Sequence, residues 1–387
     1  MSTETVAPAL TAARRRGVLA VVLVALAVVV SAVPSLNVAL PGLARDTGAD
    51  QTQLQWIVDA YALVFAGLLL PAGAIGDRFG RKPVLVAGLA LFAAGAFAAA
   101  AADGPGVIIV HRGLSGVGAA LVMPTTLSII TSSFPAAERG KAVGAWIGVA
   151  GAGAVFGLLT SGLLLEWFAW PSIFVFGGVL AILTLVAAFA VIPDSRDSTV
   201  PRVDAVSGLL SSVALAGTVF GTIEGPHRGW TDAVTLSAFA VGAICGALWL
   251  LWSLRTTDPM LDPRLFLVRG FATGVLSITA QFFVFFGMVF IVLQYLQLVL
   301  GYTALQAGLA VTPMGMVLGG LSRRAPHIVG RIGRRRAAGV GLALMTVGVL
   351  VLGSLGADAS YWPVLAGLLP IGAGMALATT PATTSIA

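Results

Sequence analysis

The chain has 387 residues, of which 58% are hydrophobic and only 10% are charged, and its mean hydropathy is +0.99. A water-soluble domain carries about 25% charged residues, so this composition excludes a soluble globular protein and indicates a polytopic membrane protein. The formal net charge of +6 does not indicate nucleic-acid binding, because the basic residues are scattered between apolar segments.

Twelve apolar stretches are long enough to cross a membrane, which takes about 20 helical residues. We therefore predict an all-α polytopic membrane protein. Its first stretch is a membrane helix and not a signal peptide, since eleven further spans follow it. The predicted spans are residues 18–40, 52–72, 83–102, 106–130, 142–165, 171–192, 206–224, 232–254, 271–299, 304–325, 337–356 and 361–381.

The lysines and arginines divide unevenly between the two sides of the membrane. With the N-terminus in the cytoplasm, 19 of the 22 fall on the cytoplasmic side, and only Arg45, Arg112 and Arg228 fall on the other. Cytoplasmic loops are enriched in these two residue types. The sequence therefore predicts a multi-pass protein of the plasma membrane with a cytoplasmic N-terminus.

The short loop between the second and third spans reads GAIGDRFGRK, from Gly73 to Lys82. Its first two glycines allow two helix ends to approach closely. The stretch resembles the signature loop of the major facilitator superfamily, G-x-L-a-D-R-x-G-R-K, which latches one conformation of the carrier on the cytoplasmic side. Any short basic loop would explain the cations but not the Gly/Asp/Gly spacing. The latch residues implied by this resemblance are Gly73, Gly76, Asp77, Arg78, Gly80, Arg81 and Lys82.

An internal repeat relates the second span to the tenth. Both open with Leu-Gln and run down into Arg-x-Gly-Arg, at residues 78–81 and 331–334, but the second copy has Gly330 where the first has Asp77. The equal orientation of the copies predicts two helical bundles in parallel pseudo-repeat, with the seventh and eighth spans as an inserted pair. The predicted parts are a cytoplasmic tail (1–17), a six-helix bundle (18–192), the inserted pair (193–255) and a C-terminal bundle (256–387).

Further motifs resemble the 14-helix drug:proton antiporter branch of that superfamily, which contains multidrug efflux transporters. Residues 37–41 (NVALP) match the end of its first-helix motif, residues 112–118 resemble its R-x-x-Q-G-x-G, and residues 297–308 resemble its Q-x-x-x-G-Y-S-x-x-x-A-G-L. The resemblance implies alternating-access export of small lipophilic or cationic compounds, with protons as the coupling ion. It also implies a C-terminal bundle with four of its six helices, the last two being absent from this sequence.

Two departures from the branch bear on coupling. Ala32 replaces the first-helix Asp, and the G-P-x-x-G-G motif of the fifth helix appears as GLLTSG, without its proline. Two alternatives therefore stay open: a uniporter or exporter of one endogenous metabolite without proton antiport, and a truncated, non-transporting membrane protein. The glycines expected to pack the fifth helix and let the bundles rock are Gly144, Gly148, Gly153, Gly157 and Gly162.

Two charged residues lie well inside predicted spans on the outer side, away from the span ends. Asp59 lies about seven residues into the second span, and Arg112 lies at a similar depth in the fourth. A charge in a span is costly and persists where it faces a cavity or a partner. We therefore predict that Asp59 is either a proton carrier, with Arg112 completing a proton-coupling pair, or a counter-ion for a cationic substrate. The alternatives are a carboxylate solvated in the external vestibule and an arginine that extends to the headgroups.

The ninth span carries polar and aromatic residues at seven-residue steps. We predict that Gln281, Met288 and Tyr295 line a substrate site together with Asn37 and Trp56, although phenylalanine-rich helices often face lipid instead. The sequence has no phosphate loop, no nucleophile–base pair and only one cysteine, so we expect neither an enzyme nor a cofactor or metal site. The expected partners are a small-molecule substrate, protons and the lipid bilayer, with no nucleic acid. A monomer is the default expectation.

Overall fold

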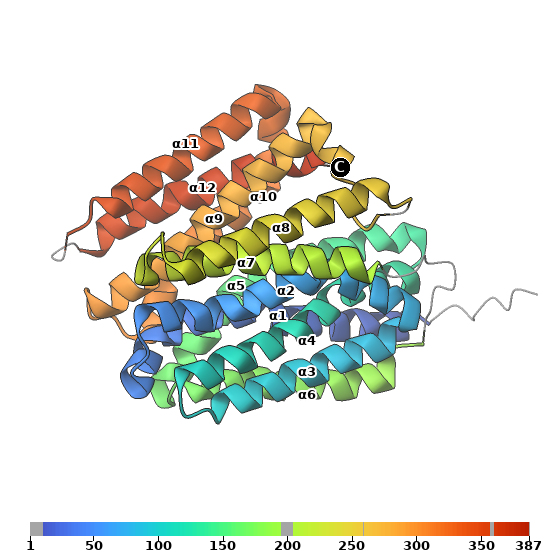
Figure 1. Cartoon of the computed structure of the whole chain (residues 1–387), viewed down its shortest axis with the longest axis horizontal. Coiled ribbons are helices and arrows are strands. Elements are labelled where there is room, and N and C mark those ends of the chain that lie inside the picture. Colours follow the sequence, from blue (N-terminus) through green and yellow to red (C-terminus); the bar gives the residue numbers. More distant parts are fainter. Residues whose placement is uncertain (1–10, 195–203, 258, 357–359, 387) are drawn as a thin grey trace, which may run out of the picture. The chain divides into compact units, whose positions relative to one another are not determined.

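The computed structural model describes residues 11–194, 204–257, 259–356 and 360–386. Figure 1 shows that these residues are helical almost throughout, and they contain no strand. The predicted all-α architecture is therefore confirmed. Residues 1–10 of the predicted tail and residues 195–203 of the predicted inserted segment lie outside the described residues.

Each predicted span overlaps one α-helix, and several helices extend beyond the span. Hydropathy marks only the part of a helix that is apolar enough for hydrocarbon, whereas the helix continues wherever its backbone hydrogen bonds continue. The sequence missed a short 3-10 helix, η1. The helices are α1 (Ala12–Thr47), α2 (Gln51–Phe79), α3 (Arg81–Ala100), α4 (Pro105–Ser133), α5 (Ala136–Trp167), α6 (Pro171–Val191), α7 (Ala205–Arg228), α8 (Ala233–Arg255), η1 (Pro263–Leu267), α9 (Arg269–Leu298), α10 (Ala304–Ile332), α11 (Arg334–Gly353) and α12 (Tyr361–Ile386).

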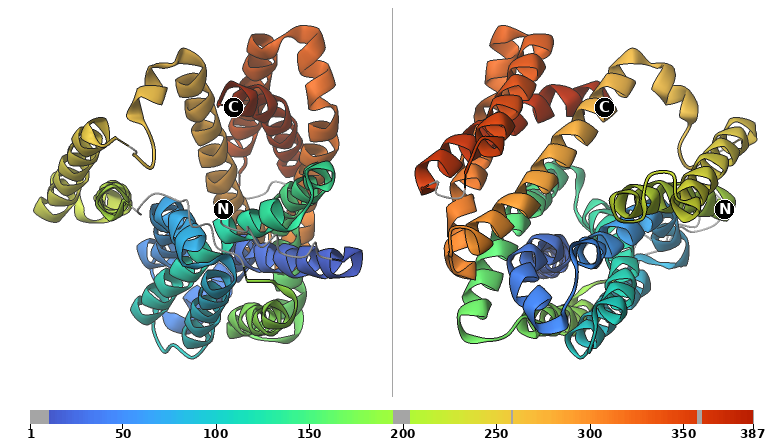
Figure 2. Two further views of the ribbon diagram at one scale, coloured as in Figure 1. Left: turned by 90° about the vertical axis from the view of Figure 1, so that its right-hand side faces the viewer. Right: turned by 60° about the vertical axis from the view of Figure 1, so that its left-hand side comes forward.

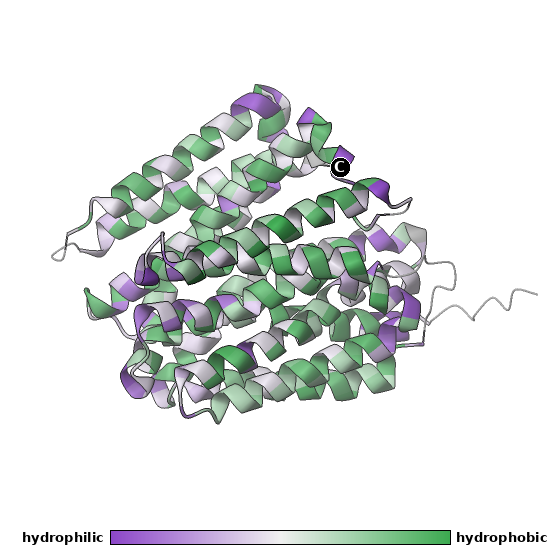
Figure 3. Ribbon diagram, in the orientation of Figure 1, coloured by the Kyte–Doolittle hydropathy of each residue, from purple (hydrophilic) through white to green (hydrophobic). Residues whose placement is uncertain are grey.

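Eleven of these helices are long and apolar enough to cross a membrane, and α5 makes a twelfth if its two parts, Ala137–Gly151 and Gly153–Trp167, count as one span. Figure 3 shows hydrophobic residues along most of the length of the helices and hydrophilic residues gathered at their ends. A helix satisfies its backbone hydrogen bonds internally, which is what a segment without access to water requires.

The described chain divides into two compact units. The first holds α2, α3, α4 and α7 with most of α6 and α8, and the second holds α9 to α12 with η1. Helices α1 and α5 contribute to both. The first unit comprises the described residues up to Ala32, Gln51–Gly153 and Phe174–Trp249; the second comprises Val33–Asp50, Ala154–Ile173 and the described residues from Leu250 onward.

Glycines bring the helices of the first unit into close contact. In Figures 1 and 2, α2, α3 and α4 lie side by side. A Cβ atom at Gly118 of α4 would lie 2.5 Å from the carbonyl oxygen of Gly88 in α3, and one at Gly116 would lie 2.6 Å from the carbonyl oxygen of Tyr61 in α2. Helices in a membrane associate through such small-residue packing, because lipid removes the hydrophobic drive between apolar faces.

The predicted inserted pair packs within the first unit. A Cβ atom at Gly217 of α7 would lie 2.6 Å from the carbonyl oxygen of Ala238 in α8, so the two helices touch along their backbones. The Ser212 hydroxyl of α7 donates to the carbonyl of Gly67 in α2 over 2.6 Å. Helix α7 is thus held against α2 by a hydrogen bond to the main chain.

The second unit is built around α12. This helix packs against α9, α10 and α11, and Figure 2 shows α11 and α12 as a neighbouring pair. A Cβ atom at Gly348 of α11 would lie 2.5 Å from the carbonyl oxygen of Gly367 in α12. The Tyr361 hydroxyl donates to the carbonyl of Ala310 in α10 over 2.9 Å.

The two repeat copies share an unusual backbone conformation. Gly80, between α2 and α3, has φ 106° and ψ 136°, and Gly333, between α10 and α11, has φ 85° and ψ 150°. Side chains other than hydrogen are disfavoured at such positive φ, so glycine is required at both turns. Each glycine ends one helix and starts the next.

We expect a methyl group at Gly118 to destabilise the protein. Its nearest neighbours in Gly118→Ala would be the backbone of Gly88 and Phe92, which cannot move as a side-chain end can. Overpacking costs about 1–3 kcal/mol, so the unfolding temperature of the purified protein should fall. Gly106→Ala is the matched control on the same helix, since its Cβ meets no atom within 4 Å. Equal unfolding temperatures for the two variants would contradict the close crossing of α3 and α4.

Candidate functional site

Arg112 is the charged residue buried most deeply in the first unit. Its side chain is only 2% exposed, its Nε donates to the carbonyl oxygen of Ile57 over 2.9 Å, and its guanidinium carbon lies 4.4 Å from the centroid of the Tyr61 ring. A desolvated cation–π contact of this kind contributes about 2 kcal/mol or more. The buried arginine is therefore held against α2.

Tyr61 extends this contact to a third helix. Its ring is buried, and its hydroxyl donates to the carbonyl of Val29 in α1 over 2.7 Å. The contacts of Arg112 and Tyr61 thus join α1, α2 and α4. Within the described part of the chain, Nη2 of Arg112 is buried without a hydrogen-bond partner, so its N–H groups remain available.

Asp59 is half-buried on α2 and interacts with the side-chain amide of Gln55, one helical turn earlier. Asp59 and Arg112 attract each other electrostatically, but among the described residues no ion pair within 4.0 Å joins them. The structure therefore places the predicted coupling residues near each other without direct contact. Tyr61, which supports Arg112, was absent from the predicted site residues.

Trp56 has a polar partner that the sequence did not indicate. Its indole Nε1 donates to a carboxylate oxygen of Glu224 over 2.7 Å, and the other oxygen of that carboxylate accepts from Arg228 over 2.6 Å. Glu224 is only 7% exposed. The spacing of four between Glu224 and Arg228 on α7 was the available signal, whereas the contact with α2 required the fold.

Of the loop residues predicted as a latch, Asp77 and Arg81 contact each other. One carboxylate oxygen of Asp77 accepts from Ser128 of α4 over 3.0 Å and from Nε of Arg81 over 3.2 Å. A Cβ atom at Gly76 would lie 2.9 Å from the Thr125 hydroxyl, so this end of α2 lies directly against α4. The carboxylate thus links α2, the first residue of α3 and α4.

The other loop residues have looser surroundings. A Cβ atom at Gly73 would lie 3.5 Å from Pro124, which is an ordinary contact. The Arg78 guanidinium lies 5.7 Å from the ring centroid of Phe79, and Lys82 is half-buried in the first turn of α3. Ser128 was missed, because no loop pattern reveals an acceptor's partner 51 residues away.

The fifth-helix glycines differ in their surroundings. A Cβ atom at Gly144 or Gly148 meets no atom within 4 Å. In contrast, one at Gly153 lies 3.0 Å from Val30 of α1, and one at Gly162 lies 2.8 Å from Leu305 of α10. The carbonyl of Gly157 accepts from Ser35 over 3.2 Å. Close packing is thus found from Gly153 onward.

The predicted substrate-lining residues of α9 have partners within the second unit. Gln281 is buried, and its side-chain carbonyl accepts from Thr379 of α12 over 2.8 Å. Met288 and Tyr295 pack against the apolar core of this unit, and the Tyr295 hydroxyl donates to the carbonyl of Gly356 over 2.6 Å. Asn37 of α1 is buried, and its side-chain oxygen has no partner within the described residues.

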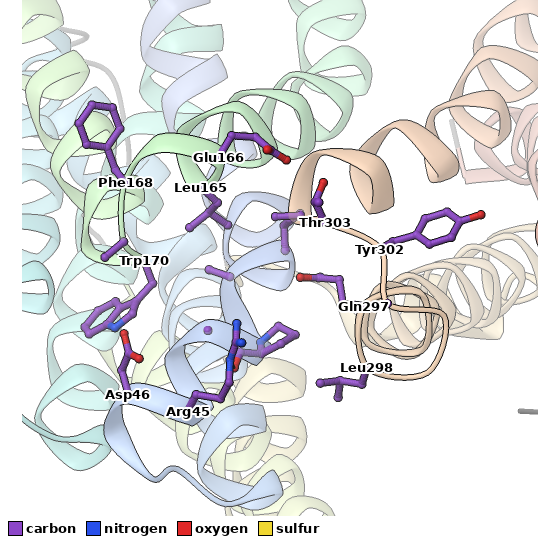
Figure 4. Close-up of a pocket in the computed structure, with 17 residues that line it drawn as sticks. Arg45, Asp46, Leu165, Glu166, Phe168, Trp170, Gln297, Leu298, Tyr302 and Thr303 are labelled. Carbon is purple, nitrogen blue, oxygen red and sulfur yellow. The ribbon is translucent and has the colours of Figure 1, made fainter.

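A pocket of about 580 Å³ opens in the second unit between the ends of α1, α5 and α9 and the start of α10. Figure 4 shows the side chains of Arg45, Gln297 and Thr303 around this space, whereas the ring of Tyr302 points away from it. Asp46 and Glu166 add two carboxylates to the lining. Such a surface can accept cationic or amide-bearing groups through hydrogen bonds. No cluster of metal-binding side chains occurs among the described residues.

Three curated proteins are similar to this chain over most of its length. Multidrug resistance protein Stp of Mycobacterium tuberculosis (strain CDC 1551 / Oshkosh) is 34% identical over 350 residues, which are 90% of this chain and 65% of that protein. Multidrug efflux pump LfrA of Mycolicibacterium smegmatis is 36% identical over 313 residues, 80% of this chain and 62% of that protein. Tetracenomycin C resistance and export protein of Streptomyces glaucescens is 32% identical over 354 residues, 89% and 66% of the two chains. The chain thus spans about two thirds of the length of these relatives.

Two solved structures have a similar fold at low sequence identity. The xylose transporter XylE from E. coli, in a partially occluded inward-open conformation, is 17% identical with a TM-score of 0.62, covering 96% of this chain and 86% of that one. The POT family transporter PepTSo is 15% identical with a TM-score of 0.65, covering 95% and 83%. These similarities confirm the predicted transporter fold. The sequence profile of the Major Facilitator Superfamily matches residues 17–387, and the chain belongs to this superfamily.

Proposed function

We propose that the protein exports small lipophilic or cationic compounds across the plasma membrane by alternating access, driven by the proton gradient. Relatives named for multidrug resistance, multidrug efflux and antibiotic export support this proposal. The observation that carries it is Arg112, a buried cation with an unpaired donor next to Asp59. An intramembrane charge of this kind marks a pathway for a substrate or a proton.

The arrangement suggests a division of roles between the two charges. Arg112 keeps its proton at any physiological pH, so it serves as a fixed positive charge. Asp59 carries the exchangeable proton: the ionised carboxylate is attracted by Arg112, and protonation removes this attraction. The resulting change in the contact between α2 and α4 would bias the carrier toward one of two conformations, which is what coupling requires.

The same proposal includes the domain organisation and the 14-helix branch. We infer a cytoplasmic tail (1–17), an N-terminal bundle (18–192), an inserted pair (193–255) and a C-terminal bundle (256–387). The hairpin of α7 and α8, which packs on α2, supports an inserted pair between two six-helix halves. The proposed latch residues around Asp77, the rocking glycines of α5, and the substrate-lining residues Asn37, Trp56, Gln281, Met288 and Tyr295 complete the mechanism.

The proposed orientation can be tested by labelling cysteines in intact cells. After replacement of Cys245 by alanine, a membrane-impermeant maleimide should label Gly104→Cys, between α3 and α4, and not Gly140→Cys, near the start of α5. Both positions have free space around a Cβ atom, so the substitutions should not disturb the fold. Permeabilised cells should label at both sites. The reverse pattern in intact cells would contradict a cytoplasmic N-terminus.

Proton coupling can be tested at Asp59. Coupling between two ligands typically changes affinity by about 5- to 150-fold, so Asp59→Asn should reduce uncoupler-sensitive drug accumulation against a gradient within this range. Asp59→Glu should retain part of it, because the carboxylate survives. The measurement is efflux from proteoliposomes with an imposed proton gradient, and Asp103→Asn, which removes an exposed carboxylate before α4, is the control.

The same experiment distinguishes the alternatives. Loss of export only for cationic compounds in Asp59→Asn would make Asp59 a substrate counter-ion and not a proton carrier. Export of one metabolite without a proton requirement would favour a non-antiport transporter, and no transport of any compound by the folded wild type would favour a non-transporting protein. Full proton-driven export by Asp59→Asn would rule out this residue as the coupling site.

The latch can be tested at Asp77. Asp77→Asn keeps an acceptor for Ser128 but loses the charge that attracts Arg81, and such partly exposed pairs contribute about 0.2–1 kcal/mol. If the pair exists in one conformation only, the balance of states shifts and export should fall by about two- to fivefold at normal expression. The measured quantity is the initial efflux rate per folded protein. An unchanged rate would reduce the loop to a determinant of orientation.

A further inference from the structure

The turn between α10 and α11 carries an unusual density of positive charge. Six arginines belong to the last three turns of α10 or to the first turn of α11, and all six are exposed. We call this group the cationic turn. Its members are Arg323, Arg324, Arg331, Arg334, Arg335 and Arg336.

The cationic turn has no acidic residue close to it in the sequence and no ion pair among the described residues. No Asp or Glu occurs between Asp262 and Asp358. In the portion of the chain that the structure describes, none of the six side chains has an ion pair or a hydrogen bond. Four of these arginines fall within six residues, at positions 331 and 334–336, and their like charges repel one another. An anion from elsewhere would therefore stabilise this end of the second unit.

In the first repeat copy, a carboxylate of the protein itself balances the positive charge of the turn. Its turn also places cations at the start of a helix, but Asp77 accepts from Arg81, four residues later, and from Ser128. The second copy keeps the glycine turn and has Gly330 at the position of Asp77. The second copy thus shares the backbone turn and the cations of the first copy but lacks its carboxylate.

The electrostatics at the start of helix α11 also favour the binding of an anion. Helix α11 begins with three arginines, has no acidic residue in its first turn and has no side chain that caps its N-terminus. The N-terminus of a helix carries a partial positive charge, so cations there are unfavourable and an anion is favourable. The helix start alone would not make a site; the six unpaired arginines around it supply the charge.

We propose that the cationic turn binds the headgroups of anionic phospholipids. The turn joins two candidate membrane spans, so its arginines lie at the ends of the spans, where headgroups lie. Polybasic segments at this level attract anionic lipids, by about fivefold in affinity for each Lys or Arg. Membrane orientation by itself requires cations on this side of the membrane. It does not require that the carboxylate be missing or that the cations be concentrated at one turn.

The experiment uses the full chain in a nonionic detergent. Phosphatidylglycerol is titrated into the micelles, and the rise in unfolding temperature gives an apparent Kd. Phosphatidylcholine and inorganic phosphate are titrated in parallel. We expect stabilisation by phosphatidylglycerol alone, weakened by salt. Stabilisation by inorganic phosphate to the same extent, or by neither phospholipid, would overturn the lipid assignment.

Two variants test the position of the site. Arg334→Gln, Arg335→Gln and Arg336→Gln together should weaken phosphatidylglycerol binding about 100-fold. The matched control replaces Arg14, Arg15 and Arg16 by Gln, which removes the same charge from the start of α1, where Arg15 already pairs with Glu138. Equal losses in both triple variants would show general attraction by net charge, and no loss in the first would place the lipid elsewhere; either result rejects the proposal.

The decisive variant adds the missing carboxylate. Gly330→Asp places an acid four residues before Arg334, as Asp77 stands before Arg81, and a Cβ atom at Gly330 meets no atom within 4 Å. Phosphatidylglycerol binding should weaken about fivefold, although all six arginines remain. Unchanged binding in a folded Gly330→Asp variant would contradict the idea that lipid replaces an internal counter-ion.

Discussion

A guanidinium buried in a helical bundle must find its partners within the protein, and the arrangement of the first unit depends on how Arg112 does so. The main-chain carbonyl of Ile57 and the face of Tyr61 receive the cation, and the Tyr61 hydroxyl in turn reaches Val29. Arg112 can approach the α2 backbone because Gly116, one turn further along α4, has no side chain where the helices cross. Small residues and a buried charge therefore act together: the first allow the contact, and the second makes separation of α2 from α4 costly.

The two repeat copies show how one backbone can serve two electrostatic roles. Both use a glycine with positive φ to turn from one helix directly into the next, and both place cations at the start of the second helix. In the first copy the counter-ion is the side chain of Asp77, which contacts α3 and α4. A movement of these helices against α2 would change its contacts. At Gly330 no such group exists, and the cations remain open to an external anion. Under the latch and lipid-site proposals, an internal carboxylate would balance the cations of the first copy and an external anion those of the second.

The charged residues of the candidate site could be identified from the sequence, but the residues that they contact could not. A charge inside an apolar segment is visible in the sequence, so Asp59 and Arg112 were identified as unusual residues. Their geometry was not predictable, since the carbonyl and the aromatic ring that hold Arg112 come from a different helix 51 or more residues away. The contacts of Trp56 with Glu224 and of Gln281 with Thr379 join residues that are even further apart in the sequence, by 168 and 98 positions. Periodicity within one helix carries no information about which neighbouring helix faces it.

The sequence by itself determined the membrane class and the positions of the helices, because hydropathy and length are local properties. Only the tertiary structure decided which helices touch. It placed α7 and α8 as a hairpin against α2, it added η1 before α9, and it divided the glycines of α5 into open and closely packed positions. These outcomes depend on the fit of backbone surfaces across tens of residues. In a bilayer, where lipid and side chains are equally apolar, that fit and the few buried polar contacts select the packing.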